Sequence, residues 1–172
     1  MRKALFALLI AAFVFGPSAA QAQAPAAEIA GGYSFARIIE GDGLNMPAGW
    51  VFTAAAPIGR IFAVVGEVSG NYKKEGDETL KVHFFQGGVR VSAPVNGTRP
   101  RPWAQFLAGG VNSSCCGEGS TDPSIEVGGG VDIPMGPAAL RVGLSFPMVF
   151  SEGEVGNLMR FQAGVAFPLG KR

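Results

Sequence analysis

The sequence predicts an all-β protein, an eight-stranded antiparallel up-and-down membrane β-barrel preceded by a signal peptide. Three observations lead to this fold class. Glycine accounts for 26 of the 172 residues and is scattered among Val, Phe and Ala without a collagen period. Segments that alternate apolar with small or polar residues recur along the chain, and a period of two is typical of strands with two different faces. Short and long connections roughly alternate between these segments, as in membrane barrels with tight turns at one end and longer loops at the other.

The first 22 residues have the pattern of a secretory signal peptide. Arg2 and Lys3 precede an apolar run over residues 4–15, which is too short to cross a membrane as a helix. Ala20-Gln21-Ala22 is an A-x-A cleavage site, and Ser18-Ala19-Ala20 is a second candidate. We therefore expect four parts: a signal peptide over 1–22, a short leader over 23–27, a barrel over 28–169 and a tail over 170–172.

Charge and hydropathy exclude two classes of protein. Without Arg2 and Lys3, 12 of the 14 basic residues remain against 13 acidic ones, a net charge of −1. With no basic patch, we expect no nucleic-acid partner. Beyond the signal peptide, no apolar run approaches 18 residues without a charge or a Gly or Pro interruption, which argues against a helical membrane protein. Nothing in the sequence indicates a cofactor or a metal site.

The last strand has the clearest alternation. Met159, Phe161, Ala163, Val165 and Phe167 share one face, and Arg160, Gln162, Gly164 and Ala166 share the other. The same pattern predicts eight strands, over 28–38, 49–56, 60–72, 80–92, 103–111, 125–133, 140–146 and 158–167. In the fourth strand, Val82 and Phe84 oppose Lys81 and His83, but Val89 and Val91 have the opposite parity. We therefore expect a bend or bulge at residues 86–88, Gln-Gly-Gly.

The connections divide into two sets. Tight turns are expected at 57–59 and 134–137, and a longer Pro-rich connection at 94–102. Polar connections are expected at 39–48, 73–79, 112–124 and 151–157. With an even number of strands, both termini lie at the periplasmic end and the longer loops lie outside.

Charged residues on the strands lie on the face opposite the large apolar side chains. In a membrane barrel this face lines the lumen, where charges must be paired. Because an eight-stranded lumen is filled by side chains, we interpret these residues as a polar network that plugs it. Its expected members are Glu67, Lys81, His83, Glu126, Asp132, Arg141 and Arg160. Arg160 is expected to pair with Glu67 or Glu126.

Periodicity alone does not distinguish this arrangement from its inverse, a soluble periplasmic lipocalin-like barrel that binds a small apolar ligand. The scarcity of Lys and Glu on the small-residue face favours the membrane barrel. Aromatic residues near strand ends also favour it, because they match interfacial girdles. These residues are Tyr33, Phe35, Trp50, Phe52, Tyr72, Trp103, Phe146, Phe150 and Phe167.

The opening segment EIAGGYSFARI, the alternating strands and the closing segment LMRFQAGVAF resemble the small eight-stranded outer-membrane β-barrel proteins, similar to the OmpA transmembrane domain and to opacity-type proteins. The resemblance implies a monomer in contact with outer-membrane lipid, with a surface partner at the loops. It also implies that insertion machinery recognises the closing strand, which in that family usually ends in a terminal Phe. Here five residues follow Phe167.

We expect no enzymatic activity. His83 is the only histidine, and its context is Val82-His83-Phe84-Phe85. Lipid A deacylases of this fold use an H-x-S arrangement, and no Ser lies two residues after His83. A base also needs a placed nucleophile and an orienting partner.

Cys115 and Cys116 are adjacent in a polar connection. Export would make their oxidation feasible. Adjacent Cα atoms are only about 3.8 Å apart, closer than a typical disulfide requires. The alternatives are a strained disulfide between Cys115 and Cys116 that pins the loop, and two free or intermolecularly linked thiols.

Overall fold

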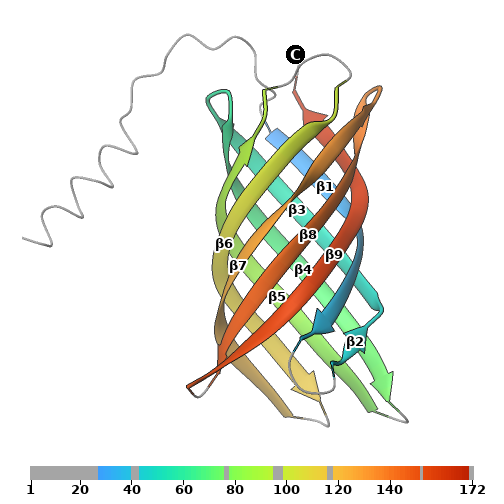
Figure 1. The fold of residues 1–172 in the computed structure, drawn as a ribbon, viewed down its shortest axis with the longest axis vertical. Helices are drawn as coiled ribbons and strands as arrows, with labels where there is room; N and C mark the ends of the chain where they lie inside the picture. The colour runs from blue at the N-terminus through green and yellow to red at the C-terminus, as the bar shows by residue number, and fades with distance from the viewer. Residues whose placement is uncertain are drawn as a thin grey trace, which may run out of the picture.

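The computed structural model describes residues 27–39, 43–75, 78–94, 99–115, 118–151 and 153–170. These residues form one closed antiparallel sheet in which each long strand pairs with the next (Figure 1). The strands are β1 (Ala27–Ile38), β2 (Asn45–Met46), β3 (Ala48–Ile58), β4 (Phe62–Glu75), β5 (Glu78–Ser92), β6 (Arg101–Cys115), β7 (Glu118–Met135), β8 (Ala138–Ser151) and β9 (Glu154–Leu169). Eight are long, β2 has two residues, and the predicted all-β up-and-down barrel is confirmed.

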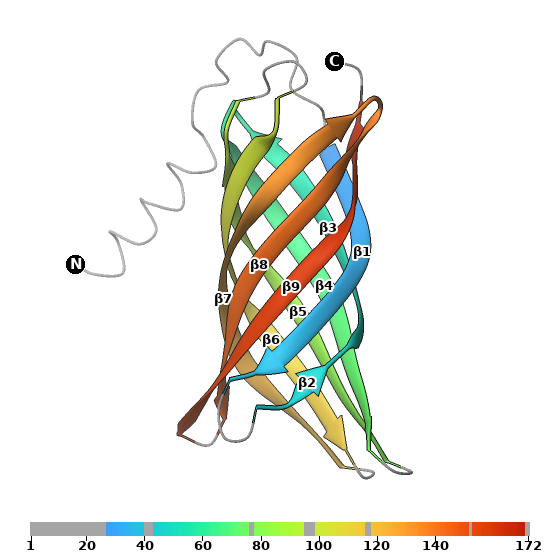
Figure 2. The same ribbon diagram turned by 45° about the vertical axis from the view of Figure 1, so that its right-hand side comes forward.

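The barrel closes where the first strand meets the last. β1 pairs with β9 along its whole length, from Ala27 opposite Leu169 to Ile38 opposite Leu158 (Figure 2). We call the end at which β1 begins and β9 ends the turn end, and the opposite end the loop end. Glycines allow the two strands to approach: a Cβ on Gly164 would lie 2.7 Å from the Cα of Gly32, and one on Gly32 would lie 2.4 Å from the Cα of Gly164.

The stagger of the strands fixes the size of the interior. A path around the barrel can be traced from Ile29 by moving, on each strand, to the residue directly opposite on the next strand. This path ends at Asn157, whose carbonyl accepts a hydrogen bond of 2.9 Å from the N–H of Ile39. The path passes through Ala54, Gly66, Gly87, Ala108, Ile125 and Met148. The return to the start is therefore shifted by ten residues (39 − 29). An eight-stranded barrel has an interior that side chains can fill.

Several strands are longer than the sequence pattern predicts. β7 begins at Glu118 instead of residue 125, and β6 continues to Cys115, so most of the expected loop over 112–124 belongs to a paired hairpin. Backbone hydrogen bonds of a hairpin need no apolar alternation, so the sequence pattern does not reveal this extension. At the turn end, Gly59 and Gly136 have φ values of 77° and 69°, which favour glycine.

A register shift occurs in the segment that leads from β2 to β3. Ala36 is opposite Met46, whereas Tyr33 is opposite Trp50. Between these two pairs, the segment from Met46 to Trp50 therefore has one residue more than the facing segment of β1. The extra residue forms a bulge next to Pro47, whose carbonyl accepts a hydrogen bond from the Tyr33 hydroxyl. The bulge changes the parity of the chain and turns Met46 into the lumen, where its exposed fraction is 0%.

The bulge expected at residues 86–88 is absent. The β4–β5 register is unbroken from Phe62 opposite Val91 to Glu75 opposite Glu78. Val82 and Phe84 are buried and therefore point inward, while Val89 and Val91 are exposed and point outward. The parity of β5 was predicted wrongly because its loop-end half presents apolar residues to the interior.

The outer surface of the barrel is apolar. Phe62 and Phe161 are 51% and 40% exposed, and Val64 and Leu144 are also exposed. Glu67, Glu126, Asp132, Arg141 and Arg160, in contrast, are buried. This orientation contradicts the lipocalin-like alternative, in which the apolar residues would line the interior. Among the residues that the structure describes, no helix is long and apolar enough to cross a membrane.

Candidate functional site: the filled lumen

The centre of the lumen is occupied by one arginine between two glutamates. Arg160 on β9 is fully buried, and its Nη2 lies 2.7 Å from Oε1 and 2.8 Å from Oε2 of Glu126. The same Nη2 also donates to Glu67, which lies on β4 across the lumen. Nη1 donates to the hydroxyl of Ser69. The structure thus brings Arg160 together with both of the partners proposed from the sequence.

A second ionic cluster lies towards the turn end. Glu28 accepts hydrogen bonds from Arg90 (3.0 Å), Arg101 (2.8 Å) and Arg141 (2.6 Å). Asp132 accepts hydrogen bonds from Arg101 at 2.8 Å and from Arg141 at 2.7 Å. This cluster contains three guanidinium groups and two carboxylates. The central cluster contains one guanidinium and two carboxylates, so the two clusters together are balanced in charge.

Gln105 connects the two clusters, and Trp103 packs within the turn-end cluster. The Gln105 carbonyl accepts from Arg90 Nη2 at 2.8 Å, and its amide nitrogen donates to Glu67 at 3.3 Å. The Trp103 ring lies between two cations, with its centroid 4.9 Å from the guanidinium carbon of Arg90 and 5.5 Å from that of Arg141. Cation–π contacts with desolvated arginines stabilise by up to about 2 kcal/mol each.

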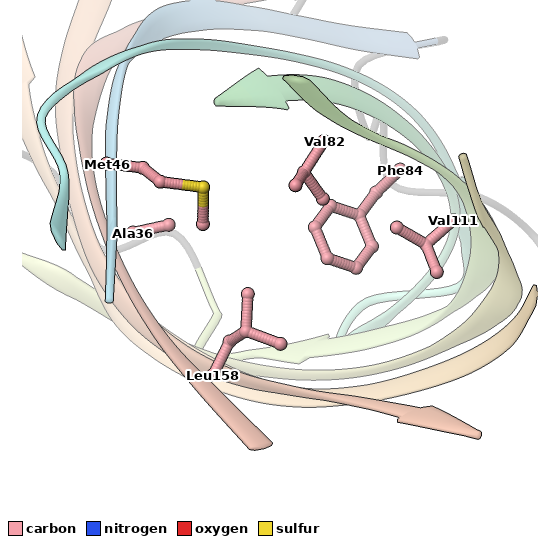
Figure 3. Close-up of a cluster of buried hydrophobic side chains, with 6 residues drawn as sticks. All are labelled: Ala36, Met46, Val82, Phe84, Val111 and Leu158. Atoms are coloured by element: carbon pink, nitrogen blue, oxygen red, sulfur yellow. The ribbon is translucent and has the colours of Figure 1, made fainter. Parts of the chain in front are cut away.

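Towards the loop end a group of apolar side chains lies in the lumen. Figure 3 shows Met46 and Ala36 on one wall facing Val82, Phe84 and Val111 on another, with Leu158 between them. We call this group the apolar plug, with members Ala36, Met46, Val82, Phe84, Val111 and Leu158. The Phe84 ring also lies 5.5 Å from the guanidinium carbon of Arg160, so the apolar plug contacts the central ionic cluster. The described lumen side chains thus form two charged clusters and one apolar group along the barrel.

Two residues that were expected in the lumen lie elsewhere. Lys81 and His83 alternate with inward-facing Val82 and Phe84 and therefore point outward. His83 Nε2 is 2.9 Å from the Tyr72 hydroxyl, on the outer surface. The prediction was wrong because the apolar plug reverses the usual polarity of the inner face at this end of β5.

Trp103 was expected in an interfacial girdle and is instead in the lumen, with an exposed fraction of 5%. Glu28, Arg90 and Arg101 were missed as members of the network. Signals in the sequence could have found two of the three: Arg90 lies between Val89 and Val91, and Glu28 begins the alternation of the first strand. Both have the parity of their buried strand neighbours.

The remaining candidate residues lie partly outside the described chain. Cys115 ends β6 and is partly buried, but Cys116 lies outside the described residues. The signal peptide over 1–22, residues 23–26 of the predicted leader and residues 171–172 of the predicted tail also lie outside them. Within the described residues, no group of three His, Cys, Asp or Glu side chains is arranged to hold a metal ion. Three buried polar atoms have no hydrogen-bond partner, namely Gln86 Oε1, Trp103 Nε1 and Arg141 Nη1, and all belong to lumen-lining residues.

Several solved structures share this barrel fold. The Neisserial surface protein A is 14% identical, with a TM-score of 0.63, over 83% of this chain and 96% of that one. Ail of Yersinia pestis, in a complex with the heparin analogue sucrose octasulfate, is 14% identical, with a TM-score of 0.59, over 82% and 96%. The N-terminal barrel domain of Pseudomonas aeruginosa OprF is 10% identical, with a TM-score of 0.51, over 84% and 98%. No family model and no curated protein sequence matches the chain.

The fold is therefore that of the small eight-stranded outer-membrane β-barrels. At these identities the likeness concerns the fold alone.

Proposed function

We propose that this protein is an exported, non-enzymatic barrel of the bacterial outer membrane, which spans the bilayer as a monomer and presents its loop end to the outside. The observation that carries the proposal is the inverted distribution of polarity: apolar side chains outside, ion pairs inside. Closure supports it too, because an open sheet edge in hydrocarbon would leave unpaired backbone groups at several kcal/mol each. In this role, insertion machinery would recognise β9, whose Phe167 and Leu169 point outward near the turn end.

The lumen supports a structural role and argues against conduction. Ions would have to pass the apolar plug and two ionic clusters whose side chains bridge opposite walls. Removing one member of a buried ion pair leaves an uncompensated charge, at a cost of about 3–5 kcal/mol. The barrel would then contribute to envelope integrity, or would bind a surface partner through its loops.

The charge of the connections at the loop end indicates the kind of surface partner. These connections contain nine acidic residues, Glu40, Asp42, Glu75, Asp77, Glu78, Glu118, Asp122, Glu152 and Glu154, against two lysines, Lys73 and Lys74. Charge complementarity favours a neutral or cationic partner. The sulfated ligand of Ail is therefore a poor guide to this chain.

Two measurements test the proposed function. Cell fractionation should find the protein in the outer membrane, with a gel mobility that changes on heating. Recovery in the soluble periplasm would contradict the membrane assignment. In planar bilayers the folded protein should show no steady conductance, and a stable ion current from the purified protein would contradict the plugged lumen.

A further inference from the structure

The outer face of β4 and β5 becomes polar as it approaches the loop end. Lys81 and His83 point outward from β5, and Tyr72 and Lys74 point outward from β4. Tyr72 is directly opposite Lys81, and Lys74 is opposite Thr79. The two lysines are therefore diagonal neighbours on one surface, with backbones about 7–8 Å apart.

A chain of hydrogen bonds lies beside these cations. Trp50 Nε1 donates to the Tyr72 hydroxyl at 2.9 Å, and this hydroxyl is 2.9 Å from His83 Nε2. If Tyr72 donates to Nε2, the N–H of His83 is on Nδ1 and points away from Tyr72. If Nε2 donates instead, the Tyr72 O–H has a proton to give. In either arrangement one donor is left for a ligand oxygen.

The position of this surface follows from the apolar band of β4. Its outward residues run from Phe62 at the turn end to Tyr72. Ten residue steps at about 3.3 Å, tilted by about 40°, span roughly 25 Å, the height of the apolar band of membrane barrels. Lys74, Lys81 and His83 thus lie at the level of the lipid headgroups, given the proposed membrane location.

A separate groove lies in the apolar band below this polar surface, on the same two strands and β3. Its lining residues include Phe52, Ala54, Gly66, Val68 and Phe85. Small residues paired in a row leave this part of the wall open: Ala54 is opposite Gly66, and Gly66 is opposite Gly87. A Cβ on Gly66 would meet no atom within 4 Å. From Tyr72 to Gly66 the strand advances six residues, or about 20 Å, close to the length of a fatty acyl chain.

We propose that this surface binds one phosphate-bearing lipid of the loop-side leaflet, with the phosphate at Lys74, Lys81 and the Tyr72–His83 pair and one acyl chain in the groove. Two cations and a hydrogen-bond donor match a phosphate oxygen cluster. Lysines at a membrane boundary often extend their charge towards water without a specific partner. The Tyr72–His83 pair beside these lysines and the groove below them on the same strands distinguish this surface.

The experiment measures lipid binding to the full chain folded in dodecyl maltoside micelles. Native mass spectrometry follows a titration with diphosphoryl lipid A and with dephosphorylated lipid A. The variant Lys74→Gln/Lys81→Gln removes the cations. Arg60→Gln/Arg99→Gln removes two exposed charges at the turn end and is the matched control. Gly66→Leu fills the groove, and Ala163→Leu places the same side chain on the outer face of β9.

The double lysine variant should bind diphosphoryl lipid A about 30-fold more weakly, the effect of two lysines near an anionic lipid surface. Gly66→Leu should also weaken binding, and neither control should. Unchanged affinity of the double lysine variant, or equal binding of dephosphorylated lipid A, would overturn the proposal. Protein dimers that form in place of the lipid complex would also overturn it.

Gel mobility of each variant before and after heating separates this proposal from the proposed function. A chain that never acquires a heat-sensitive compact form contradicts the membrane barrel itself. A chain that folds normally but binds lipid A independently of Lys74 and Lys81 contradicts only the lipid site.

Discussion

Arg160 Nη2 lies 2.7 Å from Oε1 of Glu126, and both side chains have no exposed surface. Replacing Arg160 by Met would leave Glu126 and Glu67 buried side by side without a cation. We expect a loss of about 3–5 kcal/mol in the free energy of unfolding. Urea unfolding of the barrel in lipid vesicles measures it.

The matched control for Arg160→Met is the triple variant that also carries Glu67→Gln and Glu126→Gln. Removing both carboxylates with the cation should restore most of the stability, since no uncompensated charge remains. Equal stability of Arg160→Met and the unmodified protein would show that the central ionic cluster is not buried in the folded barrel.

The two tryptophans should report the two faces of the wall. Trp50 is 41% exposed on the outside, whereas Trp103 lies in the lumen. In vesicles of brominated phosphatidylcholine, the Trp103→Phe variant, which retains Trp50, should lose most of its fluorescence. The Trp50→Phe variant, which retains Trp103, should lose little. Strong quenching of Trp103 would place it in a lipid-facing girdle after all.

The closing seam should tolerate no side chain at Gly164. A Cβ there would lie 2.3 Å from the carbonyl oxygen of Gly31 and 2.7 Å from the Cα of Gly32. Gly164→Val should therefore reduce the fraction that folds, measured by heat-sensitive gel mobility. Gly66→Val adds the same side chain where a Cβ meets no atom within 4 Å, and should fold normally. Equal folding of both variants would contradict the tight approach of β1 and β9.

The loop end should not bind sulfated polysaccharide. Its connections contain nine acidic residues and two lysines, so a polyanion would be repelled. We expect no retention of the folded protein on immobilised heparin at physiological ionic strength. Retention that disappears when Lys73 and Lys74 are replaced by Gln would show that local cations outweigh the acidic loops.

The sequence pattern was sufficient for the fold because β7, β8 and β9 alternate cleanly between large apolar and small or charged residues. In these strands the charged residues point inward and are buried, as for Asp132, Arg141 and Arg160. A membrane barrel imposes that rule only where lipid surrounds it. The candidate site could therefore be predicted in part: Glu67, Glu126 and Arg160 were grouped correctly.

The rule fails in the loop-end half of β5. There Phe84 belongs to the apolar plug and His83 points outward, so the alternation continues with inner and outer polarity exchanged. Trp103 was misplaced for a related reason: an aromatic near a strand end resembles a girdle residue, and only the neighbouring guanidinium groups of Arg90 and Arg141 explain its burial. Such pairing across walls depends on the stagger of all eight strands, which no local pattern specifies.

The pairing of Ala27 with Leu169 has a consequence for how the chain reaches its native state. The first strand has no permanent partner on one side until the last strand has been synthesised and delivered. Both sheet edges stay open meanwhile, each ready to pair with another chain. Contacts between residues this far apart in sequence form slowly, because loop closure must precede them. Until the two ends of the chain meet, both open edges can pair with other chains, which is a route to aggregation.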